Sequence, residues 1–154
     1  MTIIRKGTVA EKAITSSYPE PYNLGSDNIR TVPLSNAGGL SQYGAYLETL
    51  LPGGQSSQLH WHEKEDEFLY VLEGSLTVIE GETETVIGPG DACAWKAGEP
   101  VGHTIRNDTD RPAVYLLVGT RAEGEVCHYP GIDLRDEAGR YVHLDGTPYP
   151  SGDE

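Results

Sequence analysis

Two histidines and a glutamate lie within one short window of this sequence. The segment QLHWHEKEDEFLYVLEG, residues 58–74, contains His60, His62 and Glu67 beside a strongly apolar run. Imidazole nitrogen and carboxylate oxygen suit divalent zinc, iron, manganese, nickel or copper. The set contains no thiolate, which argues against a soft structural site. These three residues are therefore candidates for a metal site.

A β-hairpin would bring the three side chains together. Residues two apart in a strand point to the same face, so His60 and His62 project together while Trp61 points away. Glu67 follows the short charged turn EKED and begins the next apolar segment. It can therefore face the two histidines across the hairpin.

The composition predicts an all-β domain. Nineteen glycines and ten prolines divide the 154 residues into short pieces that are rich in β-branched and aromatic residues. Short strands at regular spacing favour a sandwich, a jelly roll or a barrel. The candidate strands cover residues 43–51, 57–62, 66–73, 75–80, 84–88, 91–95, 102–107 and 113–120.

The flanking segments are predicted to be extensions of the same domain. Residues 1–42 are rich in turn residues, which predicts an extended N-terminal wrap with one strand. Residues 43–120 would form the barrel. Residues 121–154 keep aromatic and aliphatic side chains between Asp-Gly and Pro turns, so we expect a tail packed on the barrel.

The spacing of the candidate ligands resembles the cupin superfamily. Its first motif is matched by glycines, histidines and a glutamate at Gly54, His60, His62, Glu67 and Gly74. A second motif would begin at Gly90 and run through GDACAWKAGEPVGHTIRN, which contains His103. Two positions depart from it: Lys96 stands where proline is usual, and four residues rather than two separate Gly98 from His103.

The resemblance implies a fold, a metal and a ligand set. The fold would be the cupin-type double-stranded β-helix, a jelly-roll barrel. The cofactor would be one divalent transition metal, Zn, Mn, Fe or Ni, held by His60, His62, Glu67 and His103. His128 and His143 match no motif position and are expected to have no ligand role.

Such a site favours small substrates with adjacent oxygens. Four protein ligands on a six-coordinate metal leave two positions where hydroxy-carbonyl compounds could chelate. By analogy with cupin isomerases, we favour a metal-dependent isomerase of a sugar or sugar acid, including sugar-phosphate-like compounds. An iron-dependent dioxygenase is the alternative enzyme, and a non-catalytic small-molecule-binding cupin is the alternative outside catalysis. The proton-transferring residue stays open among Glu48, Tyr46, Tyr70 and the tail.

Charge and hydropathy limit the classes of partner that we expect. The formal net charge of −13 repels phosphate backbones and anionic membranes, so we expect neither a nucleic acid nor a membrane partner. No segment resembles a signal peptide or a membrane span, which predicts a cytoplasmic protein.

Cys93 and Cys127 are expected to be reduced thiols. The run FLYVL is apolar on both faces, which together with the resemblance predicts a homodimer.

Overall fold

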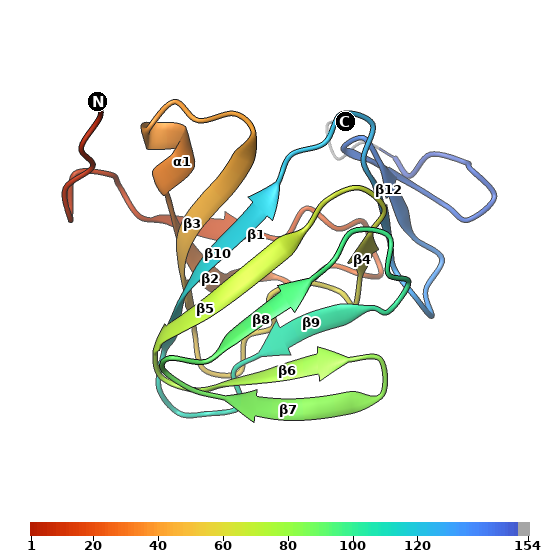
Figure 1. The fold of residues 1–154 in the computed structure, drawn as a ribbon. Helices are drawn as coiled ribbons and strands as arrows, with labels where there is room; N and C mark the ends of the chain where they lie inside the picture. The colour runs from red at the N-terminus through yellow and green to blue at the C-terminus, as the bar shows by residue number, and fades with distance from the viewer. Residues whose placement is uncertain (151–154) are drawn as a thin grey trace.

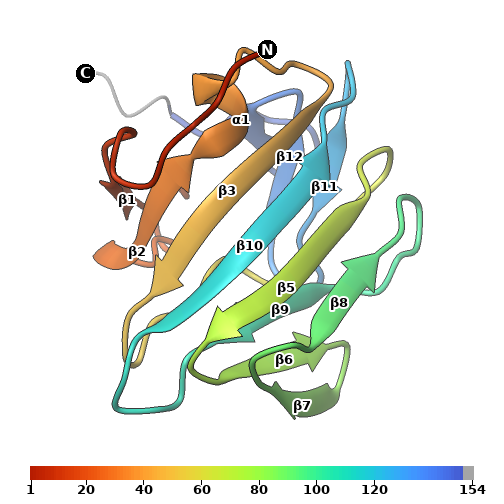
Figure 2. The same cartoon turned by 60° about the vertical axis from the view of Figure 1, so that its left-hand side comes forward.

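The computed structural model describes residues 1–150, and almost all of its regular structure is β-strand. The largest layer is an antiparallel sheet with the strand order β1-β2-β3-β10-β5-β8. Figure 2 looks onto its outer face, with β9, β11 and β12 behind it. The bounds of its strands are β1 Lys12–Thr15, β2 Ser26–Pro33, β3 Tyr43–Leu50, β10 Ala113–Thr120, β5 Glu67–Glu73 and β8 Ala92–Trp95.

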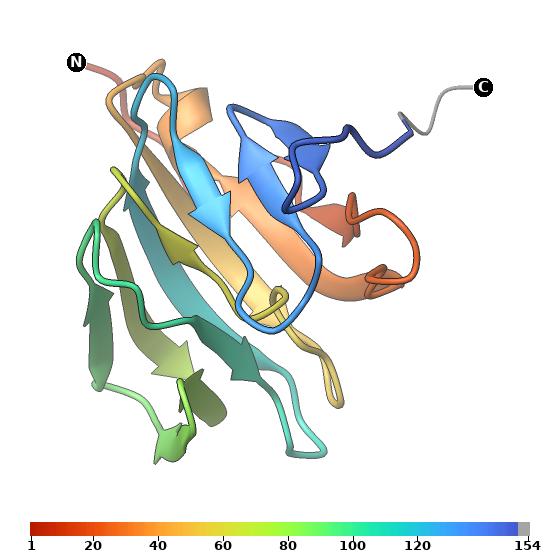
Figure 3. The ribbon, with the colours of Figure 1, turned by 90° about the vertical axis from the view of Figure 1, so that its right-hand side faces the viewer.

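Two smaller antiparallel sheets lie across from the large one (Figures 1 and 3). One has the order β7-β6-β9, and the other has the order β13-β12-β11-β4. The second sheet joins the strand that carries His62 to three strands of the C-terminal tail. The bounds are β6 Leu76–Glu80, β7 Thr83–Ile87, β9 His103–Arg106, β4 Trp61–His62, β11 Val126–His128, β12 Arg135–Glu137 and β13 Arg140–Val142.

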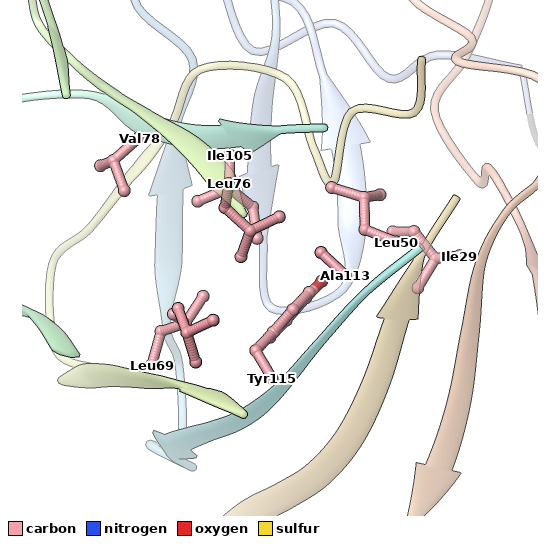
Figure 4. Packing of buried hydrophobic residues seen from close by; sticks show 9 residues of the cluster. Ile29, Leu50, Leu69, Leu76, Val78, Ile105, Ala113 and Tyr115 are labelled. Carbon is pink, nitrogen blue, oxygen red and sulfur yellow. The ribbon is translucent and has the colours of Figure 1, made fainter. Parts of the chain in front are cut away.

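The main hydrophobic core lies between the large sheet and the three-stranded sheet (Figure 4). Strand β5 turns alternate side chains toward this core: Leu69 and Val71 are buried, while Phe68, Tyr70 and Leu72 are exposed on the other face. Full burial of such an aliphatic side chain contributes roughly 1.5–3 kcal/mol. The buried cluster comprises Ile29, Leu50, Leu69, Val71, Leu76, Val78, Ile105, Ala113 and Tyr115.

A glycine of the first motif makes the turn after β5 possible. Gly74 has a φ of +77°, a conformation that residues with a Cβ rarely adopt. A Cβ at this position would also lie 2.7 Å from the Pro112 carbonyl oxygen. The chain can therefore pass this close to the start of β10 only with glycine.

The all-β expectation is confirmed, with two corrections to the predicted strands. The predicted strand 57–62 is wrong over most of its length, because only Trp61 and His62 form a ladder. The preceding residues reach β9 through single bonds and not through a continuous ladder, such as the bond that Ser56 N donates to the Ile105 carbonyl at 2.9 Å. The N-terminal segment contains two strands rather than one, and a short helix, α1 (Leu34–Ala37). No helix within residues 1–150 is long and apolar enough to cross a membrane.

Candidate metal centre

Three imidazoles converge on one carboxylate oxygen. Glu67 Oε2 lies 2.7 Å from His103 Nε2 and 3.5 Å from the Nε2 atoms of both His60 and His62. The side chains of these four residues are 6–17% exposed, so the cluster is largely shielded from solvent. The structure therefore brings all four predicted ligands together.

Backbone pairing sets these positions. His60 and His103 form an isolated antiparallel bridge, in which His60 N donates to His103 O and His103 N donates to His60 O, at 3.1 and 2.8 Å. This bridge joins the two predicted motifs directly. Glu67 begins β5 and lies opposite Trp95 of β8 and Gly119 of β10. Three separate segments of the chain, namely residues 60–62 and the first residues of β5 and β9, thus meet at the cluster.

Neighbouring oxygens orient two of the imidazoles. His60 Nδ1 donates to the Gln58 carbonyl at 2.9 Å and also contacts Ser57 Oγ at 3.1 Å. His62 Nδ1 lies 3.3 Å from Glu125 Oε1. The Glu125 carboxylate is itself held by the backbone N–H groups of Glu63 and Lys64, at 2.9 and 2.8 Å. With the proton on Nδ1, the Nε2 lone pair of each ring is available on the side of Glu67.

This arrangement fits a cation. When Nδ1 carries the proton, two electron-rich nitrogens of His60 and His62 face an electron-rich oxygen at 3.5 Å with no hydrogen to share. A divalent ion among these atoms would relieve that repulsion, and a set of three nitrogens and one oxygen suits zinc, manganese, iron or nickel. Ligand atoms of His60, Glu67 and His103 all lie within 4.8 Å of one another.

The local electrostatics favour ligand-competent protonation states. Burial alone would raise the pKa of Glu67, but hydrogen bonding, chiefly the bond from His103, holds this pKa well below its usual range. Burial lowers the pKa of His103 despite its bond to Glu67. Both shifts favour a carboxylate beside a neutral imidazole, the forms that bind metals. The His103 ring also stacks on Trp95, with centroids 4.1 Å apart.

An interior cavity of about 220 Å³ opens beside the cluster. His60, Glu67 and His103 form part of its wall, and most of the remaining wall is apolar. Glu48, Thr104 and Tyr115 are its other buried polar residues, and the Tyr115 hydroxyl donates to Glu48 Oε2 at 2.9 Å. Burial raises the pKa of Glu48 above its usual value. The cavity therefore contains a second carboxyl group, whose pKa is above the ordinary carboxyl value.

A second, outer cavity of about 560 Å³ meets the cluster from the side of the tail. Its wall includes His60, His62 and Cys127. Ligand atoms of these three residues lie within 4.8 Å of one another, so a thiol does lie beside the site. No local sequence pattern signals this proximity, because it depends on the pairing of β11 with β4. Burial raises the pKa of Cys127 to about 12.

Two of the candidate proton-transferring residues and the two remaining histidines lie away from the cluster. The Tyr46 hydroxyl accepts a bond from Arg121, and Tyr70 is exposed on the outer face of β5, so neither lines the interior cavity. His128 bonds to Glu63 and His143 bonds to Asp133, outside the cluster. Within residues 1–150 both cysteines are free thiols. Residues 151–154 of the predicted tail lie outside the described part of the chain.

Comparisons with known proteins identify the family. A family model described as "Cupin domain" matches residues 46–119. A solved structure from Silicibacter pomeroyi DSS-3, described as a sugar phosphate isomerase from a cupin superfamily, is 36% identical; the match covers 97% of this chain and 98% of that one, with a TM-score of 0.88. No match is found among curated proteins.

More distant structures share the fold alone. A predicted oxalate decarboxylase from Thermotoga maritima is 22% identical over 79% of this chain and all of its own, with a TM-score of 0.63. The polyketide cyclase RemF from Streptomyces resistomycificus is 21% identical, with 78% and 79% of the two chains covered and a TM-score of 0.60. The matched domain, the near full-length relative and the jelly-roll arrangement together show that this chain belongs to the cupin superfamily.

Proposed function

We propose that this cupin is a metal-dependent isomerase of a small hydroxy-carbonyl compound, of the sugar or sugar-acid type. One observation carries the proposal: a cluster of three histidines and one glutamate borders a cavity that holds a second buried carboxyl group, Glu48. The description of the 36% identical relative as a sugar phosphate isomerase supports the same class.

The ligand set would bind the metal, and the cavity would bind the substrate. His60, His62, Glu67 and His103 would hold one divalent ion. Such an ion supplies Lewis-acid chemistry, which stabilises negative charge on substrate oxygens. The cavity of about 220 Å³ lies below the usual range of about 300–1,000 Å³ for drug-sized ligands, so we expect a substrate of only a few carbons.

Glu48 is the residue that we expect to move the proton. Isomerisation takes a proton from the carbon beside the carbonyl and returns one to the neighbouring carbon, which a single carboxylate can do. A raised pKa brings the titration of Glu48 closer to neutral pH, where it can both accept and donate. Tyr115 fixes the carboxyl group through its hydrogen bond.

The apolar wall protects this chemistry from water. Ile14, Ile29, Leu69, Ile105 and Leu117 line the cavity around the polar groups. A wall of this kind limits access of bulk water, strengthens electrostatic interactions and slows protonation of the intermediate by solvent. The substrate would therefore exchange protons mainly with Glu48.

Proton exchange tests the proposal without requiring the natural substrate. The manganese-loaded protein is incubated in D₂O with a series of three- to five-carbon aldoses and ketoses, and NMR follows deuterium at the carbon beside the carbonyl. We expect exchange with at least one compound, and a loss of about 10²- to 10⁴-fold in Glu48→Gln with unchanged metal content. Glu82→Gln, in the exposed turn after β6, is the matched control. Equal exchange in Glu48→Gln, or no exchange with any compound, would contradict the proposal.

The same preparation separates the other candidates. An iron-dependent dioxygenase would consume oxygen when loaded with iron and substrate, which an oxygen electrode measures. A non-catalytic binding protein would bind a compound of the series without exchange or oxygen uptake. Each alternative therefore gives a result that isomerisation does not.

A further inference from the structure

The donor atoms around the candidate metal centre fall into two groups that face different cavities. His60, Glu67 and His103 line the interior cavity, whereas His60, His62 and Cys127 line the outer one. Within each group the ligand atoms lie within 4.8 Å of one another. His60 is the single member that both groups share.

The sheet formed with the tail places the thiol beside the histidines. Strand β11 runs antiparallel to β4, with Cys127 directly opposite His62. Residues directly opposite in such a pair project to the same face, so the Cys127 side chain points to the side of the His62 ring. Cys127 is only 7% exposed, and Tyr129 and Leu134 pack with it. The thiol is therefore a fixed part of the outer cavity wall.

We propose that His60, His62 and Cys127 form a second metal position, which takes soft or borderline ions such as Cd²⁺ and Zn²⁺ in place of the inner position. Thiolate and imidazole together prefer these ions, whereas carboxylate and imidazole suit Mn²⁺. On binding, the S–H bond breaks, a sulfur–metal bond forms and the proton passes to solvent.

The two positions exclude each other because they compete for one nitrogen. His60 Nδ1 is bonded to Gln58 and Ser57, which leaves only Nε2 for an ion. An ion in the outer position takes this nitrogen, while Glu67 and His103 can keep their 2.7 Å hydrogen bond. The chain thus binds one ion at a time, and the chemical softness of the ion decides on which side of His60 it is bound.

Ultraviolet absorption tests the outer position directly, because a thiolate bound to Cd²⁺ or Co²⁺ gives a charge-transfer band that imidazole and carboxylate do not. The reduced, metal-free protein is titrated with CdCl₂, and in a second series with CoCl₂. We expect a band that saturates at one ion per chain. The band should be lost in Cys127→Ser and kept in Cys93→Ser, the matched control for the other free thiol.

Two further measurements distinguish loss of the outer metal position from misfolding of the variant. Mn²⁺ binding, followed by electron paramagnetic resonance, should persist in Cys127→Ser, which shows that this variant is folded and retains the inner position. Glu67→Gln should keep the Cd²⁺ band while its Mn²⁺ affinity falls. The absence of a band in the wild type, or a band that survives in Cys127→Ser, would overturn the proposal. Equal loss of Mn²⁺ and Cd²⁺ in Cys127→Ser would also overturn it, because the positions would then not be separate.

Discussion

Glu48 is a buried carboxyl group whose protonation links the interior cavity to the stability of the fold. Burial raises its pKa in the folded state, so the folded protein holds this proton more tightly than the unfolded chain. At a pH below the ordinary carboxyl pKa, both states are protonated. As pH rises above that value, the unfolded chain releases the proton first, and the folded state loses stability relative to it.

The variant Glu48→Gln should remove this dependence on pH. Gln can still accept the bond from Tyr115 but cannot ionise, so its stability relative to the wild type should increase from about pH 4 to pH 8. The increase is about 1.4 kcal/mol for each unit by which the pKa is raised. Urea unfolding of the metal-free proteins measures it, with Glu82→Gln as a control whose difference from the wild type should stay constant. A constant difference for Glu48→Gln as well would count against a raised pKa.

The residues of the site differ in how far the sequence could reveal them. The four candidate ligands follow motif spacing, because local chain geometry repeats wherever two strands and a turn present the same donors. Glu48 could be named only among several options, since its burial depends on the pairing of β3 with β10. The contact between Glu125 and His62 joins residues 63 positions apart, so no local pattern signals it.

At the scale of elements, the four-stranded tail sheet completes the site. Strand β11 pairs with β4, and the residues around it bring Glu125 and Cys127 to His62. The tail was expected to pack on the barrel, but its register could not be predicted, because β11, β12 and β13 are each only three residues long and flanked by turn residues. Packing of the buried side chains Cys127, Tyr129 and Leu134 stabilises these short strands.

Leu134 is the fully buried anchor of this sheet. It is 0% exposed and packs in a cluster with Cys127 and Tyr129. Leu134→Ala should lower the free energy of unfolding by about 2–5 kcal/mol and weaken metal binding by about 10- to 100-fold, because the support of His62 by Glu125 loosens. Denaturant unfolding and chelator competition measure the two effects. Leu144→Ala, at an exposed position of the tail, should change neither. Indistinguishable results for the two variants would show that the tail packing does not support the site.

At the scale of the whole molecule, no helix or strand of residues 1–150 covers the outer face of the large sheet over β5 and β10 (Figure 2). Phe68, Tyr70 and Leu72 of β5 are 40%, 38% and 43% exposed. Apolar residues of neighbouring strands continue this face, with Leu116 and Val118 of β10 opposite Tyr70 and Phe68, and Leu47 and Ala45 of β3 next to them. A contiguous apolar surface of this kind is typical of an interface, and a second copy of the chain presents the same strands for a symmetric contact.

We therefore expect a homodimer that pairs these outer faces, and Tyr70→Glu should dissociate it by placing a charge at the centre of the patch. Light scattering after size exclusion should give twice the 16.7 kDa chain mass for the wild type and 16.7 kDa for the variant. Val86→Glu, on exposed strand β7 of another sheet, should remain dimeric. Each copy carries a net charge of −13, so salt should screen the repulsion and tighten the wild-type dimer. A monomeric wild type, or a dimer that survives in Tyr70→Glu, would exclude this interface.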